Sequence, residues 1–236
     1  NQLTDRDVPT DYVITGTADP AAEILVNGET ATRVGDFWSR TVTVDNSTHP
    51  AYLPVSVEGL LYGAGPNGET VQATADAGLL LVPQTPEVPV YDEDGNLIED
   101  GLRSYTWDAE NRLIVVEPRS DFIGIQTIPK VEFTYDYRGR RTLKKVYTWE
   151  AFEAQWELAR TERFLYDDWN MVAILNDDDE LSQSFLWGTD LSGTMQGAGG
   201  VGGLLAFIEH TDTAPDVHFA ISDANGNVIG LFDATT

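Results

Sequence analysis

The chain of 236 residues contains no cysteine, which excludes disulfide bonds, thiolate metal sites and cysteine nucleophiles together. It also has no stretch that approaches the roughly 20 apolar residues of a membrane-spanning helix. Its first residues, Asn1 to Asp7, lack the basic and apolar regions of a signal peptide. We therefore expect no insertion into a membrane, and we interpret the sequence as a mature protein or as a piece excised from a longer one.

Basic residues are scarce in this chain. Lysine and arginine number 14 against 39 aspartates and glutamates, so the formal net charge is −25. This charge repels phosphate groups and therefore predicts that nucleic acid is not a partner. Because 42 % of the residues are hydrophobic, the chain is not a disordered acidic tail, and its length suits one large or two modest domains.

Histidine is rare as well. The three histidines, His49, His210 and His218, show no metal-ligand spacing, so we expect surface or packing roles for them. The triplet that begins at Asp190 is interrupted by Leu191 and has no second copy, which argues against an aspartic protease pair. We predict no catalytic residue, no metal ligand and no cofactor in this chain.

Residues 1–83 are predicted to form a small β-sandwich. Asn27-Gly28 separates two runs of strand-forming residues, and this dipeptide is the strongest short signal for a β-hairpin. Further strands are expected at residues 12–18, 37–44, 53–61 and 70–81. The region resembles the Ig-like modules of bacterial surface proteins, although it lacks the Cys-Trp-Cys pattern of true immunoglobulin domains.

Three prolines occur within the seven residues from Pro83 to Pro89. This density favours an extended spacer and excludes a central strand. We place a linker at residues 84–90 and a second domain at residues 91–236.

The second domain is organised around one recurring phrase. Two aromatic residues two positions apart are followed by an acidic residue and then by glycine or asparagine, as in Tyr105-Thr106-Trp107-Asp108 and Phe133-Thr134-Tyr135-Asp136. The spacing places both aromatic rings on one face of a strand, and the residues that follow favour a tight turn. The acidic or glycine position of the phrase recurs at Asp92, Asp108, Asp136, Asp167, Gly188 and Asp223.

These phrases resemble the YD repeats of the Rhs family. The run from Trp187 to Leu205 is similar to the stretch found near the end of such repeat arrays. The resemblance implies curled antiparallel β-sheets, as in the hollow shells of toxin complexes or the surface modules of teneurins. It implies no active site within the repeats.

One segment of the second domain carries conflicting signals. Residues from Trp149 to Arg163 contain strong helix formers, whereas the flanking residues read as strands. We predict a hairpin whose tip holds at most one helical turn.

Three further patterns match known binding motifs. Residues Gly197 to Gly202 match the GxGxxG motif of dinucleotide-binding domains. No strand-to-helix unit surrounds this motif, so we interpret it as a glycine-rich turn. The turns that begin at Asp92 and Asp223, and the run from Asp177 to Glu180, have the oxygen side chains of calcium loops without the complete EF-hand pattern. We interpret them as turns, with calcium binding as the alternative.

The sequence as a whole predicts an all-β, non-enzymatic structural protein outside the cell or on its surface. Edge strands pair with other chains unless lysine or another device blocks them, and the only lysines are Lys130, Lys144 and Lys145. We therefore hypothesise that copies assemble into a fibre or surface layer through open sheet edges. The alternatives are a fragment of an Rhs shell that encloses a toxin cargo, and a glycan-binding adhesin that uses exposed tryptophans, chiefly of the first domain.

Overall fold

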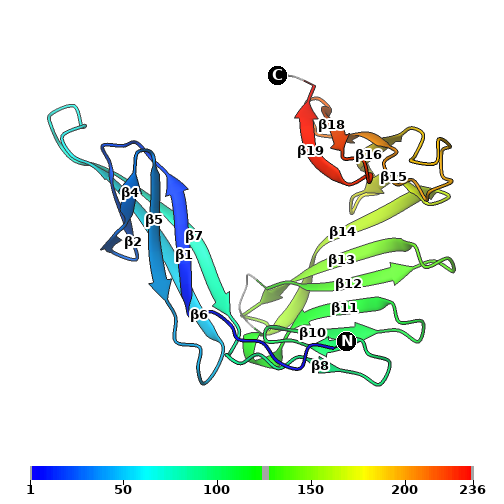
Figure 1. Ribbon diagram of the computed structural model, residues 1–236, viewed down its shortest axis with the longest axis horizontal. Coiled ribbons are helices and arrows are strands. Elements are labelled where there is room, and N and C mark those ends of the chain that lie inside the picture. Colours follow the sequence, from blue (N-terminus) through cyan, green and yellow to red (C-terminus); the bar gives the residue numbers. More distant parts are fainter. Residues whose placement is uncertain (1, 124–127, 235–236) are drawn as a thin grey trace. The chain divides into compact units, whose positions relative to one another are not determined.

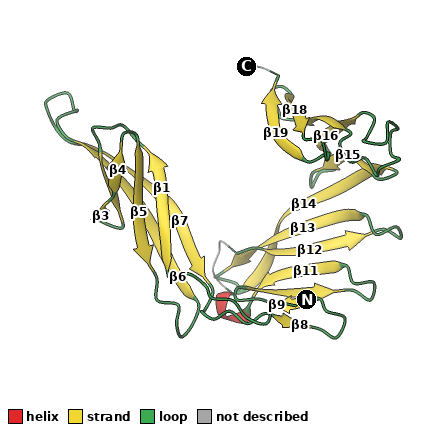
Figure 2. Cartoon of the chain, viewed as in Figure 1, coloured by secondary structure: helices red, strands yellow, loops and turns green. Residues whose placement is uncertain are grey.

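The computed structural model describes residues 2–123 and 128–234, and all their side chains except those of residues 74–77. Within these ranges the chain forms 19 β-strands and one short 3₁₀ turn, η1 (Ser120–Phe122), without an α-helix (Figure 2). All paired strands are antiparallel, which confirms the predicted all-β class. No described helix has the length and apolar character that crossing a membrane requires.

The chain divides into two compact units. Unit 1 comprises Asn1–Tyr105 with Pro118–Phe122, and unit 2 comprises Thr106–Glu117 with Ile123–Thr236. The first unit extends to Tyr105, beyond the linker predicted at residues 84–90. The domain boundary at that linker stays a prediction.

Unit 1 contains two sheets that pack face to face (Figure 1). The first has the order β1-β5-β4 and the second the order β3-β2-β6-β7. Their bounds are β1 (Asp11–Thr17), β2 (Glu23–Val26), β3 (Glu29–Thr30), β4 (Thr32–Val34), β5 (Phe37–Thr43), β6 (Ala51–Leu61) and β7 (Val71–Val82). The strands expected from the sequence are therefore present, whereas the resemblance to Ig-like modules stays a prediction.

The core of unit 1 joins both sheets. Trp38 of β5 is buried together with Ile24 and Val26 of β2 and Val55 of β6. Gly16 lies against the indole, because a Cβ at this position would come 2.5 Å from the ring of Trp38. The Trp38 ring therefore packs directly on the backbone of β1, and this close packing requires glycine at position 16.

The proline-rich stretch after β7 is attached to unit 1. The backbones of Arg6 and Glu87 exchange two hydrogen bonds of 3.0 and 2.9 Å. The Glu87 carboxylate is buried, forms an ion pair with Arg6 and accepts the Gly101 amide at 2.8 Å. A buried carboxylate with these partners holds the stretch in place on both sides.

Strands β8 to β19 follow one another in sequence order within one antiparallel sheet. Their bounds are β8 (Val90–Tyr91), β9 (Leu97–Glu99), β10 (Arg103–Trp107), β11 (Leu113–Pro118), β12 (Lys130–Tyr135), β13 (Arg141–Glu150), β14 (Gln155–Asp167), β15 (Asn170–Leu175), β16 (Leu181–Trp187), β17 (Leu204–Glu209), β18 (Asp216–Ser222) and β19 (Val228–Asp233). The hairpin predicted around Trp149–Arg163 is confirmed as β13 and β14, and its tip is a four-residue turn without a helix.

The recurring phrase closes every second strand of this series, from β8 to β18. Six turns share one geometry, in which the first residue donates its amide to the carbonyl of the fifth residue and the fourth residue has a positive φ. This is a type I turn followed by a left-handed residue, which inserts a bulge into the hairpin. The turns begin at Asp92, Asp108, Asp136, Asn176, Asp190 and Asp223. Four of these are predicted phrase positions, whereas the predicted positions Asp167 and Gly188 begin no turn of this geometry.

The first side chain of each turn holds the loop by accepting backbone amides. Asp136 Oδ1 accepts the amides of Arg138 and Arg140 at 2.9 and 3.0 Å, and its Oδ2 accepts Arg140 Nε at 2.8 Å. These bonds lower the pKa of Asp136, because they favour its charged form against the opposing effect of burial. The aspartate of the phrase is therefore a structural group in the turn.

Arginine then connects one turn of unit 2 to the next. Arg112 is paired with Asp108, lies 5.4 Å from the centre of the Tyr135 ring and donates to the Asp136 carbonyl at 3.2 Å. Arg140 repeats this arrangement one hairpin later, with Asp136, with Tyr166 at 5.1 Å and with the Asp168 carbonyl. The tyrosine, the aspartate and the arginine of the phrase thus have distinct roles, and we call this series the arginine ladder.

We predict that Asp136→Ala destabilises unit 2, because two amides and one guanidinium lose their acceptor. The expected fall in melting temperature is roughly 2–8 °C for a domain of this size. Asp136→Asn should fall between wild type and Asp136→Ala, because an amide oxygen still accepts the two backbone bonds. Thermal unfolding followed by circular dichroism measures the change.

The matched control is Asp177→Ala, which removes the same charge from an exposed position. The prediction is contradicted if Asp136→Ala and Asp177→Ala melt at the same temperature.

Candidate functional site

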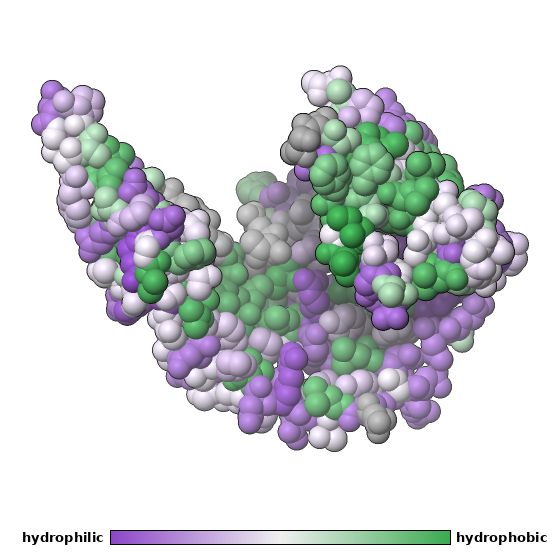
Figure 3. All heavy atoms as spheres, turned by 45° about the horizontal axis from the view of Figure 1, so that its top comes forward, coloured by the Kyte–Doolittle hydropathy of each residue, from purple (hydrophilic) through white to green (hydrophobic). Residues whose placement is uncertain are grey.

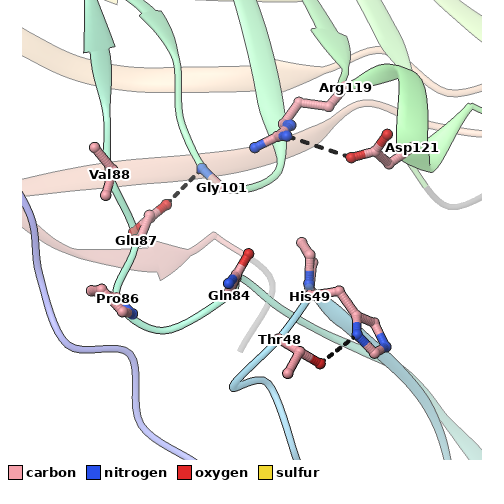
Figure 4. Close-up of a pocket in the computed structure, with 10 residues that line it drawn as sticks. Thr48, His49, Gln84, Pro86, Glu87, Val88, Gly101, Arg119 and Asp121 are labelled. Atoms are coloured by element: carbon pink, nitrogen blue, oxygen red, sulfur yellow. Dashed lines mark hydrogen bonds and ion pairs between the residues drawn. The ribbon is translucent and has the colours of Figure 1, made fainter.

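A cavity described in unit 1 has a volume of about 560 Å³ (Figure 4). Its polar lining combines Arg119 with Asp121, His49 and Gln84. Arg119 makes long contacts of 3.4 Å, to Asp121, to Glu99 and to the Asp100 carbonyl, whereas the His49 ring is 2.8 Å from the Thr48 hydroxyl. One guanidinium among carboxylates gives the cavity no strong potential of either sign. The Thr48 hydroxyl and the His49 imidazole are exposed neighbours in the sequence, and among the described residues no carboxylate binds this imidazole to orient it as a base.

A smaller cavity of about 320 Å³ lies in unit 2 and is lined by His210, which is paired with a serine. The Ser184 hydroxyl is 2.8 Å from His210 Nε2, and Glu162 and Glu209 line the same cavity. Glu162 is occupied by Lys144 at 2.9 Å, and Glu209 accepts from Gln183 at 3.2 Å. Among the described residues no carboxylate binds the imidazole, so the pair lacks the third group that orients a catalytic base.

The sequence did not indicate this pair. His210 was assigned a surface or packing role, and Ser184 lies on a different strand, 26 positions earlier. Only the pairing of β16 with β17, in which Ser184 lies opposite Ile208, brings the two side chains together. A local motif does not report a contact of this kind.

The glycine-rich run after β16 is organised by Asp190. This residue is 5 % exposed, and its carboxylate accepts the amides of Ser192, Ala198 and Gly200 at 2.9, 2.6 and 3.2 Å. The Ser192 hydroxyl donates a fourth bond at 2.6 Å and is the foremost cause that lowers the pKa of Asp190 to about 2. Amides that a phosphate would need are therefore bound to the protein's own carboxylate, and the run leads into strand β17 instead of a helix.

The acidic turns that matched calcium loops use their oxygens in the same way. Asp92 accepts the Asn96 amide at 2.8 Å and the Asn96 side chain at 3.0 Å, and Asp223 does the same with Asn227 at 2.9 Å. The side-chain bond from the asparagine is the foremost cause that lowers the pKa of each aspartate. The described residues hold no group of three or more histidines and carboxylates placed for a metal ion, and calcium binding stays untested.

The comparisons with known proteins gave one informative match. No family model matches the chain. Over 171 residues it is 26 % identical to the tRNA3(Ser)-specific nuclease WapA of Bacillus spizizenii, and the alignment covers 70 % of this chain. The chain spans only 6 % of the length of that relative. The resemblance to the Rhs family stays a prediction.

This match corrects the prediction that the protein is not an enzyme, because the relative is named as a nuclease. The prediction rested on the lack of a catalytic motif within these 236 residues. A stretch that matches 6 % of a nuclease need not contain its catalytic residues, so the lack of a catalytic motif here does not show that the whole protein is without activity.

We predict that Asp190→Asn reduces the dependence of stability on acidic pH. The folded pKa of Asp190, about 2, lies below its ordinary unfolded value of about 3.9, so its contribution is complete above pH 4 and is lost as the pH falls through 2. The variant should be less stable than wild type at neutral pH and should lose stability less steeply between about pH 4 and pH 2. Thermal unfolding across this range measures both effects.

Asp177→Asn, which makes the same chemical change at an exposed site, serves as the control. An Asp190→Asn protein with the wild-type pH slope would contradict the assignment.

Proposed function

We propose that these residues form a repeat-sheet segment of a large nuclease that acts on tRNA. The observation that carries the proposal is the similarity to WapA over 70 % of the chain. The arginine ladder is consistent with a structural role for the sheet in such a protein, because Arg112 and Arg140 attach two successive hairpins to the next one by the same set of contacts. The location outside the cell or on its surface belongs to the same proposal.

The net charge of −25 restricts how such a segment takes part. An acidic sheet repels the phosphates of tRNA, so the strongest contacts with the substrate are made by other parts of the nuclease. Two described pairs within this chain place a hydroxyl and an imidazole at bonding distance, Ser184 with His210 and Thr48 with His49, and the first joins residues that are far apart in the sequence.

The test is tRNA cleavage by the complete product of the gene that encodes these residues. Cleavage is read from fragments on a denaturing gel, with the 236-residue chain and its His210→Ala variant assayed in parallel. We expect the complete product to cleave tRNA and the 236-residue chain to leave it intact. Intact tRNA after incubation with the complete product would contradict the proposal, and cleavage by the short chain that His210→Ala abolishes would move catalysis into this cavity.

A second candidate, assembly of copies through sheet edges, is favoured by the surface of the last two strands. Exposed apolar residues are gathered there, in the part of unit 2 near the C-terminus (Figure 3). They are Phe219 and Ile221 of β18 and Val228, Ile229, Leu231 and Phe232 of β19. β19 is the last strand in the described sheet order and carries no lysine, so its free edge has little protection against pairing.

We predict that the wild-type chain associates with rising concentration and that Ile229→Lys with Phe232→Lys keeps it monomeric. Lysine on an edge strand opposes pairing through its charge and hydration. Sedimentation velocity over a range of concentrations measures the mass. Val34→Lys, on an exposed strand position of unit 1, is the matched control and should associate as wild type does. A wild-type chain that stays monomeric throughout would contradict the candidate.

A further inference from the structure

Two neighbouring hairpins of unit 2 present aromatic side chains in their turns. Tyr137 lies in the turn between β12 and β13 and is 92 % exposed, and Trp169 lies in the turn between β14 and β15 and is 49 % exposed. β12, β13, β14 and β15 are successive antiparallel strands, so both turns lie at the same end of the sheet (Figure 1). We name Tyr137, Arg138, Asp168, Trp169 and Gln196 the turn rim.

Four residues of the turn rim, all except Tyr137, are held in place by contacts with one another and with the backbone. The Arg138 guanidinium lies 5.1 Å from the centre of the Trp169 ring and forms an ion pair with Asp168. Gln196 accepts the Trp169 amide at 3.0 Å and donates to the Asp167 carbonyl at 2.9 Å. A surface fixed before it meets a ligand loses little conformational entropy on binding.

These aromatic rings have no role in the arginine ladder. In the same hairpins, Tyr135 and Tyr166 lie beneath Arg112 and Arg140 and are half-buried, as structural tyrosines are. Tyr137 packs on nothing that requires an aromatic ring, since almost its whole surface meets solvent. Tyrosine and tryptophan in a polar turn provide a large, stiff contact area, which is typical of recognition surfaces.

The charges of the turn rim identify the chemistry that fits it. Arg138 is paired with Asp168, and the neighbouring Arg140 is paired with Asp136. A phosphate backbone would have to compete with these carboxylates within a chain of net charge −25. A neutral ligand leaves both pairs intact and uses the hydrogen-bonding capacity that remains on their oxygens and nitrogens.

We infer that the turn rim binds a neutral saccharide. One apolar face of a pyranose ring stacks on an aromatic side chain, and its hydroxyl groups donate to Asp168 and accept from Arg138 and Gln196. The exposed half of Trp169 and the free ring of Tyr137 supply two such platforms. The inference does not depend on the proposed nuclease function.

The signal for this surface was present in the sequence. Tyr137 and Trp169 each follow an aspartate inside a polar turn, where an aromatic ring has no strand face to cover. The sequence predicts sugar-binding aromatics chiefly in the first domain, whereas the structure exposes this pair in unit 2.

The test is titration calorimetry of the 236-residue chain with short neutral oligosaccharides of glucose, mannose, galactose and N-acetylglucosamine. We expect saturable binding to at least one of them, with an affinity that changes little between about 50 and 200 mM salt, because no phosphate is involved. Trp169→Ala should weaken binding about tenfold or more, and Tyr137→Ser roughly three- to tenfold.

Phe152→Ser is the matched control, because Phe152 is 95 % exposed in a turn at the opposite end of the same sheet. Tyr137→Ser is expected to fold as wild type does, because the Tyr137 side chain supports no packing, so a loss of binding in this variant is not caused by misfolding. Absence of binding to every saccharide at millimolar concentration overturns the inference, as does equal loss in Phe152→Ser. Binding of single-stranded RNA that these variants abolish and salt weakens also overturns it, in favour of a nucleic-acid surface.

Discussion

The sheet of unit 2 depends on a carboxylate that accepts the amides of its own turn. Asp136 satisfies two amides that a turn with a left-handed fourth residue leaves pointing inward, and Gly139 supplies that residue with φ of 79°. The second carboxylate oxygen then orients Arg140, whose guanidinium reaches Tyr166 in the next hairpin. One short phrase thus fixes both the turn and its connection to its neighbour, which explains why its three residue types occur together.

This arrangement frees the sheet from dependence on a large apolar core. Of the buried hydrophobic residues most belong to unit 1, whereas Val146 and Ala206 are among the few in the strands of unit 2. Its strands are joined by backbone pairing and carry half-buried aromatic rings, and arginines link successive turns through contacts with a ring and a carbonyl of the next hairpin. Because unit 2 buries few apolar side chains, those on β18 and β19 and the aromatic rings in the turns remain exposed and available for other partners.

Much of the fold could be predicted from local signals in the sequence. Asn27-Gly28 marks a real hairpin, with Asn27 and Gly28 at φ of 50° and 79°, and the alternating strands predict the hairpin of β13 and β14 despite helix-forming residues. The long-range contacts could not be predicted. Glu87 reaches Gly101, and Ser184 meets His210, only after strands have paired, and no spacing in the sequence encodes such pairings.

A double-mutant cycle between Arg140 and Tyr166 tests the arginine ladder most directly. Arg140→Met and Tyr166→Leu keep most of the apolar volume while they remove the charge and the ring. The account predicts that the two single changes destabilise unit 2 and that their effects are not additive, with a coupling free energy of roughly 0.5–1 kcal/mol, as for a guanidinium over a partly exposed ring. Strictly additive effects would show that the guanidinium and the ring do not stabilise one another, and would contradict the role assigned to the ladder.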